Sequence, residues 1–147
     1  MNIIEGDVFK CEEDLIVHQV NCRGVMGSGI AREVRNRFPD VYNRYKDDCW
    51  KYGSRCLGAF SCVPISTSKG IVNLYGQDGF GVDKCYTDYK AVKRAFRLLA
   101  MFAKKNNFSI AIPYYIGCNR GGGDWDIYSA IIEKELNGIN YTIYRKY

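Results

Sequence analysis

The chain has 147 residues, of which 47% are hydrophobic and 25% are charged, and its formal net charge is +5. These values predict one globular domain, residues 1–147, with a single hydrophobic core, and they exclude an intrinsically disordered chain. No apolar run approaches the roughly 20 residues of a membrane span, and the N-terminus lacks the basic and apolar regions of a signal peptide. We therefore expect a cytoplasmic protein with no membrane partner.

The chain contains seven cysteines and one histidine. Because no Cys-x-x-Cys pair occurs, we interpret the cysteines as reduced, small hydrophobic residues and expect no metal site. A cysteine nucleophile at Cys22 or Cys118 is the alternative interpretation. The 21 basic residues are scattered along the chain and do not form a stripe with interleaved aromatic residues. We therefore expect no strong sequence-specific binding of nucleic acid.

Apolar runs and turn signals divide the chain into alternating strands and helices. We expect six strands, at residues 2–5, 15–20, 57–65, 70–75, 109–113 and 141–144. Ile30, Val34 and Phe38 form the buried stripe of a first helix, and Asp40 is expected to cap the second. A long third helix begins at residue 87 or 88, and a fourth follows the N-cap residue Asp124. This alternation predicts an α/β fold, a three-layer α/β/α sandwich with a central mixed, largely parallel sheet.

Two glycine-rich stretches follow the second and fifth expected strands. The first spans residues 18–31 and the second spans residues 117–125, and each leads into a helix. Glycines let the backbone approach a ligand closely, and the first turn of a helix offers unpaired N–H groups and a positive dipole end. Ligands of open α/β sheets lie beyond the carboxyl ends of the strands. We therefore expect both loops to hold one ligand through a diphosphate, although the Gly-x-x-x-x-Gly-Lys-[Ser/Thr] motif of kinases and GTPases is absent from the sequence.

Three motifs resemble those of macrodomains, which bind ADP-ribose. Residues 17–31, Val-His-Gln-Val-Asn-Cys-Arg-Gly-Val-Met-Gly-Ser-Gly-Ile-Ala, are similar to the first ligand loop of that family. Residues 4–8 and residues 116–125 resemble two further signatures in the same order. The resemblance is strongest to the branch of the terminal ADP-ribose protein glycohydrolase, its bacterial antitoxin relatives and the yeast ADP-ribose 1''-phosphate phosphatase. Residues 52–58 are similar to the phosphatase in particular, and the resemblance implies a macrodomain-like fold over nearly the whole chain.

The resemblance implies a role for each motif. Asp7 would accept a hydrogen bond from the adenine amino group, helped by the amide of Val8, and Asn21 would bind hydroxyls of the distal ribose. Tyr144 would pack against the adenosine, although an aromatic residue there is as often part of the core. Backbone amides of both loops would hold the diphosphate. The implied ligand-binding residues of the loops are Gly24, Val25, Met26, Gly27, Ser28, Gly29, Ile30, Gly117, Cys118, Asn119, Arg120, Gly121, Gly122 and Gly123.

Lys84 and His18 are the candidate catalytic side chains. In the glycohydrolase branch, a lysine in this loop attacks the anomeric carbon of the distal ribose, which an amine does only in its neutral form. Lys84 is flanked by Asp83 and Asp88, and that context is more typical of a solvated surface lysine. The acidic residue that assists the lysine in the glycohydrolase falls here on Gly121, which has no side chain.

Asp124 is a third candidate, because it lies three residues after Gly121 and could replace the missing acid. It is equally suited to cap the helix that follows. His18 lies where the phosphatase-like branch also carries a histidine, and a neutral imidazole could act as a general base or position water. Otherwise, a histidine within a strand is more often a satisfied core residue.

The resemblance, carried by these residues, implies a hydrolase that acts at C1'' of the distal ribose in ADP-ribose derivatives. It would remove acyl-linked ADP-ribose from macromolecules or dephosphorylate ADP-ribose 1''-phosphate. The alternative is a non-catalytic ADP-ribose-binding module. We expect the partner to be ADP-ribose or an ADP-ribosylated macromolecule, and we expect a monomer that uses no cofactor.

Overall fold

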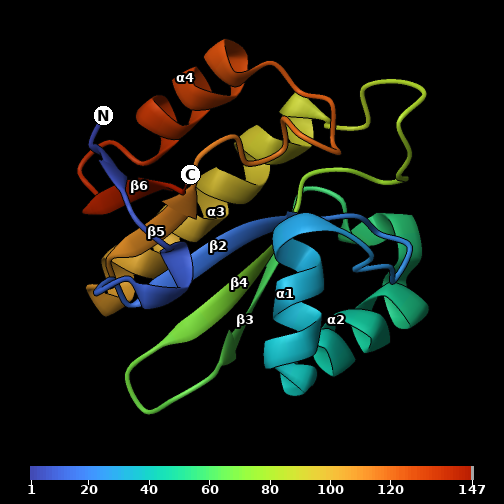
Figure 1. The fold of residues 1–147 in the computed structure, drawn as a ribbon, viewed down its shortest axis with the longest axis horizontal. Helices are drawn as coiled ribbons and strands as arrows, with labels where there is room; N and C mark the ends of the chain where they lie inside the picture. Colours follow the sequence, from blue (N-terminus) through green and yellow to red (C-terminus); the bar gives the residue numbers. More distant parts are fainter. Residues whose placement is uncertain (147) are drawn as a thin grey trace.

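The computed structural model describes residues 1–146, which form a three-layer sandwich around a six-stranded sheet (Figure 1). The strand order is β1-β6-β5-β2-β4-β3, and within these residues only β3 runs antiparallel to its neighbour. The strands are β1 (Ile3–Glu5), β2 (Leu15–Val20), β3 (Phe60–Pro64), β4 (Gly70–Tyr75), β5 (Ile110–Pro113) and β6 (Tyr141–Arg145). The expected α/β class and the mixed, largely parallel sheet are therefore confirmed.

Residues 1–146 contain four α-helices, which cover the two faces of the sheet in pairs (Figure 1). They are α1 (Gly29–Arg37), α2 (Pro39–Tyr52), α3 (Tyr89–Asn106) and α4 (Trp125–Glu135), with 3-10 turns η1 (Val8–Lys10) and η2 (Gly53–Cys56). No helix in the described part of the chain is long and apolar enough to span a bilayer.

The sheet divides the interior into two hydrophobic cores, so the prediction of a single core is wrong, and the alternation of side chains along β2 separates the two. Leu15 and Val17 pack into the core that α3 and α4 complete, whereas Ile16 and Val20 pack into the core that α1 and α2 complete. By the same alternation, His18 lies on the α1/α2 face and Gln19 on the α3/α4 face. His18 and Gln19, which are consecutive at the end of a buried strand, therefore lie on opposite faces of the sheet.

Two local predictions differ from the structure. The prediction that Asp40 caps the second helix is wrong, because α2 begins at Pro39, whose fixed φ suits the first helical position, and Asp40 lies in the first turn. The strand expected at residues 57–65 is shorter and begins at Phe60, because η2 and the turn after it occupy the preceding residues. The expected cap of α4 is confirmed, since the Asp124 side chain accepts hydrogen bonds from the amides of Asp126 and Ile127.

Candidate functional site

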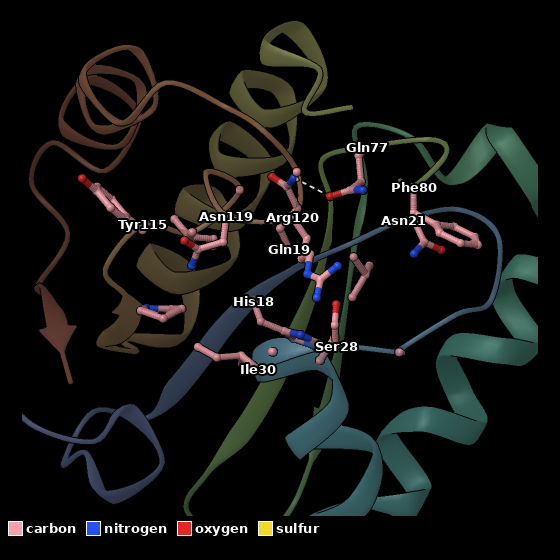
Figure 2. Close-up of a pocket in the computed structure, with 18 of the residues that line it drawn as sticks. His18, Gln19, Asn21, Ser28, Ile30, Gln77, Phe80, Tyr115, Asn119 and Arg120 are labelled. Atoms are coloured by element: carbon pink, nitrogen blue, oxygen red, sulfur yellow. Dashed lines mark hydrogen bonds between the residues drawn. The ribbon is translucent and has the colours of Figure 1, made fainter. Parts of the chain in front are cut away.

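A pocket of about 400 Å³ opens beyond the carboxyl ends of β2 and β5 (Figure 2). The end of β2, the first glycine loop and the start of α1 line one side, and the loop between β5 and α4 lines the other. Its lining residues are His18, Gln19, Val20, Asn21, Val25, Gly27, Ser28, Gly29, Ile30, Ala31, Gln77, Phe80, Pro113, Tyr114, Tyr115, Ile116, Gly117, Asn119, Arg120 and Gly121. The volume is typical of a small-ligand site, and both glycine-rich loops border it.

Backbone amides supply hydrogen-bond donors on both sides of this pocket. On one side, α1 begins at Gly29, and the N-cap residue Ser28 makes no capping hydrogen bond through its side chain, so the N–H groups of the first turn are open. On the other side, the amides of Asn119, Arg120 and Gly121 form no hydrogen bond within residues 1–146. Together with the positive dipole end of α1, these donors suit an anionic group such as a diphosphate.

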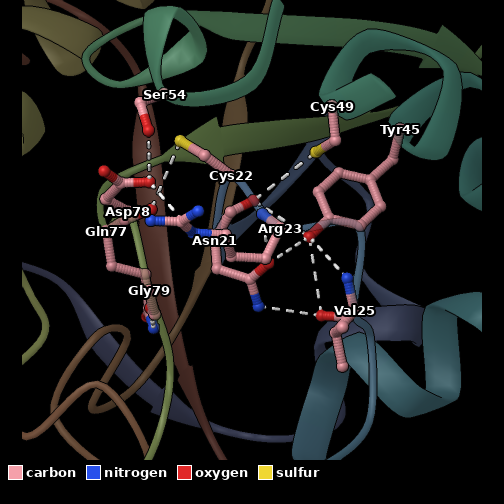
Figure 3. Close-up of polar contacts among 10 residues, drawn as sticks. All are labelled: Asn21, Cys22, Arg23, Val25, Tyr45, Cys49, Ser54, Gln77, Asp78 and Gly79. Carbon is pink, nitrogen blue, oxygen red and sulfur yellow. Dashed lines mark hydrogen bonds and ion pairs between the residues drawn. The ribbon is translucent and has the colours of Figure 1, made fainter.

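Side-chain hydrogen bonds fix the first glycine loop (Figure 3). The Oδ1 of Asn21 accepts from the Tyr45 hydroxyl at 2.6 Å and from the amide of Arg23 at 2.9 Å, and its Nδ2 donates to the carbonyl of Val25 at 2.9 Å. The Tyr45 hydroxyl also accepts from the amide of Val25 at 3.1 Å, and burial raises its pKa, so it remains a donor to Asn21. One N–H of Asn21 is left for a ligand, which is compatible with the implied contact to ribose hydroxyls.

Gln19 connects the second glycine loop to the sheet and to α4. Its Nε2 donates to Oε1 of Gln77 and to Oγ1 of Thr87, both at 2.9 Å, and its Oε1 accepts from the Tyr128 hydroxyl at 2.9 Å. Thr87 donates in turn to the carbonyl of Gly117 at 2.6 Å. This half-buried network holds β2, the loop at residues 76–88, the second glycine loop and α4 in fixed positions relative to one another.

Two glycines in the second loop have no space for a side chain. Gly117 has φ +72°, and a Cβ there would lie 2.4 Å from Cε2 of Tyr128. A Cβ on Gly121 would lie 2.5 Å from Oγ1 of Thr87 and 2.6 Å from the carbonyl oxygen of Gly117. The folded loop therefore excludes, at position 121, the acidic side chain that the glycohydrolase branch carries.

His18 is 2% exposed, and its imidazole lies beside Ser28 at the start of α1 (Figure 2). Its Nε2 lies 2.7 Å from Oδ1 of Asn73, its register partner on β4, and Asn73 donates to Oγ of Ser61 at 3.2 Å. The Nδ1 atom is buried and has no hydrogen-bond partner in the described part of the chain. Burial lowers the pKa of His18 to about 4, although the Asn73 contact opposes this, so the ring is neutral at pH 7. With Nε2–H donating to Asn73, the lone pair of Nδ1 is a buried acceptor that no group within residues 1–146 uses.

Lys84 does not line the pocket. It is exposed, and its Nζ lies 5.0 Å from the ring centroid of Tyr86. Its backbone adjoins the second loop, because a Cβ on Gly122 would lie 3.3 Å from the carbonyl oxygen of Lys84. Asp124 also lies outside the lining, and its carboxylate caps α4. Of the three candidate catalytic side chains, the structure thus brings only His18 to the pocket wall.

The two residues expected at the adenine end also lie outside the lining. Asp7 Oδ1 accepts from the amide of Phe9 at 2.9 Å, and its Oδ2 lies 3.5 Å from Nζ of Lys146. Burial acts to raise the pKa of Asp7, but these two contacts outweigh it and hold the pKa below the ordinary value. The Tyr144 hydroxyl donates to Glu13. The other expected residues outside the lining are Val8, Gly24, Met26, Cys118, Gly122 and Gly123.

Several lining residues were not identified from the sequence. Tyr115 adopts φ +64°, a left-handed conformation that is uncommon outside glycine, and its ring stacks on Tyr114 with centroids 4.4 Å apart. Phe80, from the loop at residues 76–88, is 51% exposed beside the pocket. The aromatic pair directly after β5 is the one sequence signal that could have revealed Tyr115. Nothing in the sequence distinguishes Phe80 from other loop residues.

The cysteines do not support the alternative of a thiol nucleophile. All seven are free, and burial raises the pKa of Cys22 to about 12 and that of Cys118 to about 11. A thiol with a raised pKa supplies little thiolate at neutral pH. Residues 1–146 also contain no group of three or more His, Cys, Asp or Glu side chains that could hold a metal ion.

Sequence comparisons identify relatives with ADP-ribose chemistry. No protein-family model matches the chain. The DNA ADP-ribosyl glycohydrolase of Mycobacterium tuberculosis is 27% identical to this chain over an alignment of 147 residues, and the alignment covers 95% of this chain. The ADP-ribose 1''-phosphate phosphatase of Meyerozyma guilliermondii is 34% identical over 72 residues, covering 47% of this chain and 41% of the phosphatase. The chain spans 40% of the length of the DNA ADP-ribosyl glycohydrolases that it matches.

Solved structures share the fold. A macrodomain protein from Streptomyces coelicolor superimposes with a TM-score of 0.80 at 25% identity, covering 97% of each chain. Thermosipho africanus DarTG in complex with ADP-ribose superimposes with a TM-score of 0.83 at 25% identity, covering 97% of this chain and 40% of DarTG. The chain therefore has the fold of the macrodomains, and its sheet order and two glycine loops support that similarity. Its sequence is similar to the glycohydrolases and, over a shorter stretch, to the phosphatases named above.

Proposed function

We propose that this macrodomain binds ADP-ribose in the pocket and hydrolyses adducts joined to C1'' of the distal ribose. The observation that carries the proposal is the cavity of about 400 Å³ whose two glycine loops present unused backbone amides from opposite sides. A diphosphate needs such donors, and the loops supply them without a dedicated cationic pair. The relatives support the same ligand, since their names are those of ADP-ribose hydrolases.

Two kinds of adduct are candidates for the substrate. The similarity to DNA ADP-ribosyl glycohydrolase extends over 95% of the chain, whereas the similarity to the phosphatase covers 47% of it. We therefore propose an ADP-ribosylated nucleic acid as the principal substrate and ADP-ribose 1''-phosphate as the second. In both, a bond from C1'' to the leaving group is broken.

His18 is the side chain best placed to assist this reaction. In hydrolysis, the oxygen of water bonds to C1'', the leaving group departs with the electron pair of the broken bond, and the proton lost by water neutralises the leaving group. The buried Nδ1 of His18 can accept a hydrogen bond from a ribose hydroxyl or from that water. A pKa of about 4 makes the ring a weak base at pH 7. His18 therefore contributes by orienting the hydroxyl or the water, and it does not act as the general base that takes up the proton.

A non-catalytic ADP-ribose-binding module is the second candidate function. It is favoured by two observations: Lys84 is exposed outside the pocket lining, and position 121 cannot carry the acid that accompanies lysine in the glycohydrolase branch. A module of this kind would bind the diphosphate of ADP-ribose through the same contacts but would not hydrolyse ADP-ribose adducts.

Hydrolysis assays on an ADP-ribosylated oligonucleotide and on ADP-ribose 1''-phosphate separate the two functions. We expect the wild-type protein to release ADP-ribose, His18→Gln to slow release about 100-fold, and Lys84→Ala to slow it less than about threefold. Lys104→Ala, an exposed lysine in the last turn of α3, is the matched control. Binding of ADP-ribose without release from either substrate would identify a binding module. A loss of activity in Lys84→Ala, with full activity in His18→Gln, would contradict the role given to His18.

We also propose that the protein acts as a cytoplasmic monomer. The seven free cysteines suit a reducing compartment, in which disulfides do not form. Size-exclusion chromatography with light scattering tests the monomer, and a mass near 34 kDa would contradict it, since one chain is 16.8 kDa and a dimer is about twice that.

A further inference from the structure

Arg120 is the only charged side chain that lines the pocket within residues 1–146, because the His18 ring is neutral and no Asp or Glu belongs to the lining. Figure 2 shows its guanidinium directed from the second glycine loop into the pocket, toward the side that Ser28 lines. A cleft that carries charge of one sign only attracts ligands of the opposite sign. The pocket therefore carries a positive charge that an anionic ligand would neutralise.

The guanidinium of Arg120 has no partner of its own in the part of the chain that the structure describes. It takes part in none of the ion pairs, side-chain hydrogen bonds or cation–π contacts found there. The carboxylates of the adjoining loops are occupied: Asp124 caps α4, and Asp78 accepts from Ser54 and lies 3.4 Å from Nε of Arg23. A structural role in holding the loop therefore does not account for the Arg120 side chain.

Backbone donors lie on both sides of this guanidinium. The first turn of α1, after Ser28, has open N–H groups, and the amides of Asn119, Arg120 and Gly121 form no hydrogen bond within residues 1–146. The positive dipole end of α1 faces the same space. A diphosphate carries a negative charge on each phosphate and has enough oxygens to accept from both loops and from a guanidinium at once. The charge and the donors thus converge on one group between the loops.

We propose that the Arg120 side chain binds the diphosphate of ADP-ribose and is a specificity-determining residue of the pocket. The inference rests on the proposed function for the identity of the ligand. The contact expected from the sequence uses the backbone amide of Arg120, whereas this contact uses its side chain. A guanidinium adds to the amides a full charge and a planar pair of N–H donors that matches two phosphate oxygens. A ligand with a single phosphate would engage fewer of these donors.

The test is a calorimetric titration of the wild-type, Arg120→Gln and Arg120→Lys proteins with ADP-ribose, ADP and AMP. We expect Arg120→Gln to weaken the binding of ADP-ribose and ADP about tenfold or more, because a charge-assisted pair is lost. We expect Arg120→Lys, which keeps the charge but not the planar pair of donors, to weaken binding about threefold. Arg120→Gln should also reduce the preference for ADP over AMP. Because Arg120 is exposed, both variants should unfold in urea at the wild-type midpoint.

Arg32→Gln is the matched control. Arg32 is an exposed arginine on α1 that lies outside the pocket lining and has no carboxylate partner within residues 1–146. Its removal lowers the net charge by the same amount, so we expect affinity within about twofold of the wild type. An equal loss of affinity in Arg32→Gln and Arg120→Gln would overturn the inference, because it would reveal an effect of net charge alone.

Equal affinity of the wild-type and Arg120→Gln proteins for ADP-ribose and ADP would also overturn the inference, even where the wild type hydrolyses an ADP-ribose adduct as proposed. Binding of ADP that depends on Arg120, from a protein that hydrolyses no adduct, would refute the proposed hydrolysis and support the role of Arg120. A wild-type protein with no measurable affinity for either ligand would refute both.

Discussion

The two glycine loops border the same pocket but are held in place by different means. The first loop, which ends β2, is fixed by side chains, because Asn21 and the Tyr45 hydroxyl bond to one another and to its backbone. The second loop is fixed by close packing, because Gly117 and Gly121 lie against Tyr128 and Thr87 with no space for a Cβ. The first loop therefore depends on side-chain hydrogen bonds, whereas the second adds to its hydrogen bonds, such as that from Thr87 to the Gly117 carbonyl, a packing so close that no side chain fits.

The same contrast extends to the candidate catalytic side chains. Next to the first loop, His18 is buried and oriented by Asn73, with Nδ1 left for a ligand. Next to the second loop, Lys84 is exposed above the ring of Tyr86. A side chain whose position is already fixed before substrate binds loses less entropy in catalysis than one that must be ordered. The pocket is therefore preorganised on the side of the first loop.

The largest effect is expected from Gly121→Ala. The new Cβ would lie 2.6 Å from a backbone oxygen, and the loop would have to move as a whole, so we expect a loss of about 3 kcal/mol or more in the free energy of unfolding. Urea denaturation measures this loss. Gly27→Ala in the first loop is the matched control, because its Cβ would meet Val25 at an ordinary 3.5 Å, and its stability should change by less than about 0.5 kcal/mol. Equal stability of the two variants would contradict the contrast between the loops.

A second effect is expected from protonation of His18. Its pKa is about 4 in the folded protein and near 6.5 when unfolded, so below pH 6.5 the unfolded chain binds the proton more strongly. The stability contributed by neutral His18 is present above pH 6.5 and is lost as pH falls toward 4, by about 3 kcal/mol in all. Because His18 is the only histidine, its NMR signal reports this titration directly.

The pH dependence of His18→Gln provides the comparison for this measurement. The difference in the free energy of unfolding between the wild-type and His18→Gln proteins should change between pH 6.5 and pH 4 and be constant above that window. An NMR titration of His18 with a midpoint near 6.5 would show that the folded protein does not disfavour the charged ring, and it would refute the buried state described above.

A smaller effect is expected from Tyr45→Phe, which removes a hydroxyl and leaves the rest of the ring. Asn21 is 7% exposed and would lose one of its acceptor bonds, so we expect a loss of about 1–3 kcal/mol in the free energy of unfolding and weaker binding of ADP-ribose. Tyr42→Phe, on the same helix, is the matched control, because the Tyr42 hydroxyl forms no hydrogen bond within residues 1–146 and both cations beside its ring remain. If both variants bind ADP-ribose as the wild type does, the first loop does not depend on these hydrogen bonds.

The strands and the mixed, largely parallel class of the sheet followed from sequence periodicity, but the strand order and the contacts at the pocket did not. Strands, helices and the cap at Asp124 were predicted, because these depend on local patterns of apolar and capping residues. The pairing of His18 with Asn73 depends on β2 and β4 lying side by side in one register, and the sequence contains no signal for that neighbourhood. The hydrogen bonds of the Tyr45 hydroxyl could not be predicted for a related reason. The apolar stripe of α2 predicts that the Tyr45 ring is buried, but it does not predict the partner of the hydroxyl oxygen.

The placement of the site residues illustrates the same limit. Both glycine loops were expected beside one ligand, and both border the pocket, because the order of strand, loop and helix sets where the strand ends meet. Lys84 was a candidate because of its position in the chain, and only the packing of residues 76–88 shows that its side chain lies outside the lining. The aromatic pair after β5 could have drawn attention to Tyr115, but its left-handed conformation, φ +64°, has no signal in the sequence.

The most direct test of the account is a calorimetric titration of the wild-type protein with ADP-ribose, with AMP as the control ligand. We predict a single site with a dissociation constant in the low micromolar range, about −7 to −8 kcal/mol, and at least tenfold weaker binding of AMP, which lacks the diphosphate and the distal ribose. Absence of heat with ADP-ribose at high concentration, from protein shown to be folded, would contradict the claim that the two glycine loops form an ADP-ribose site.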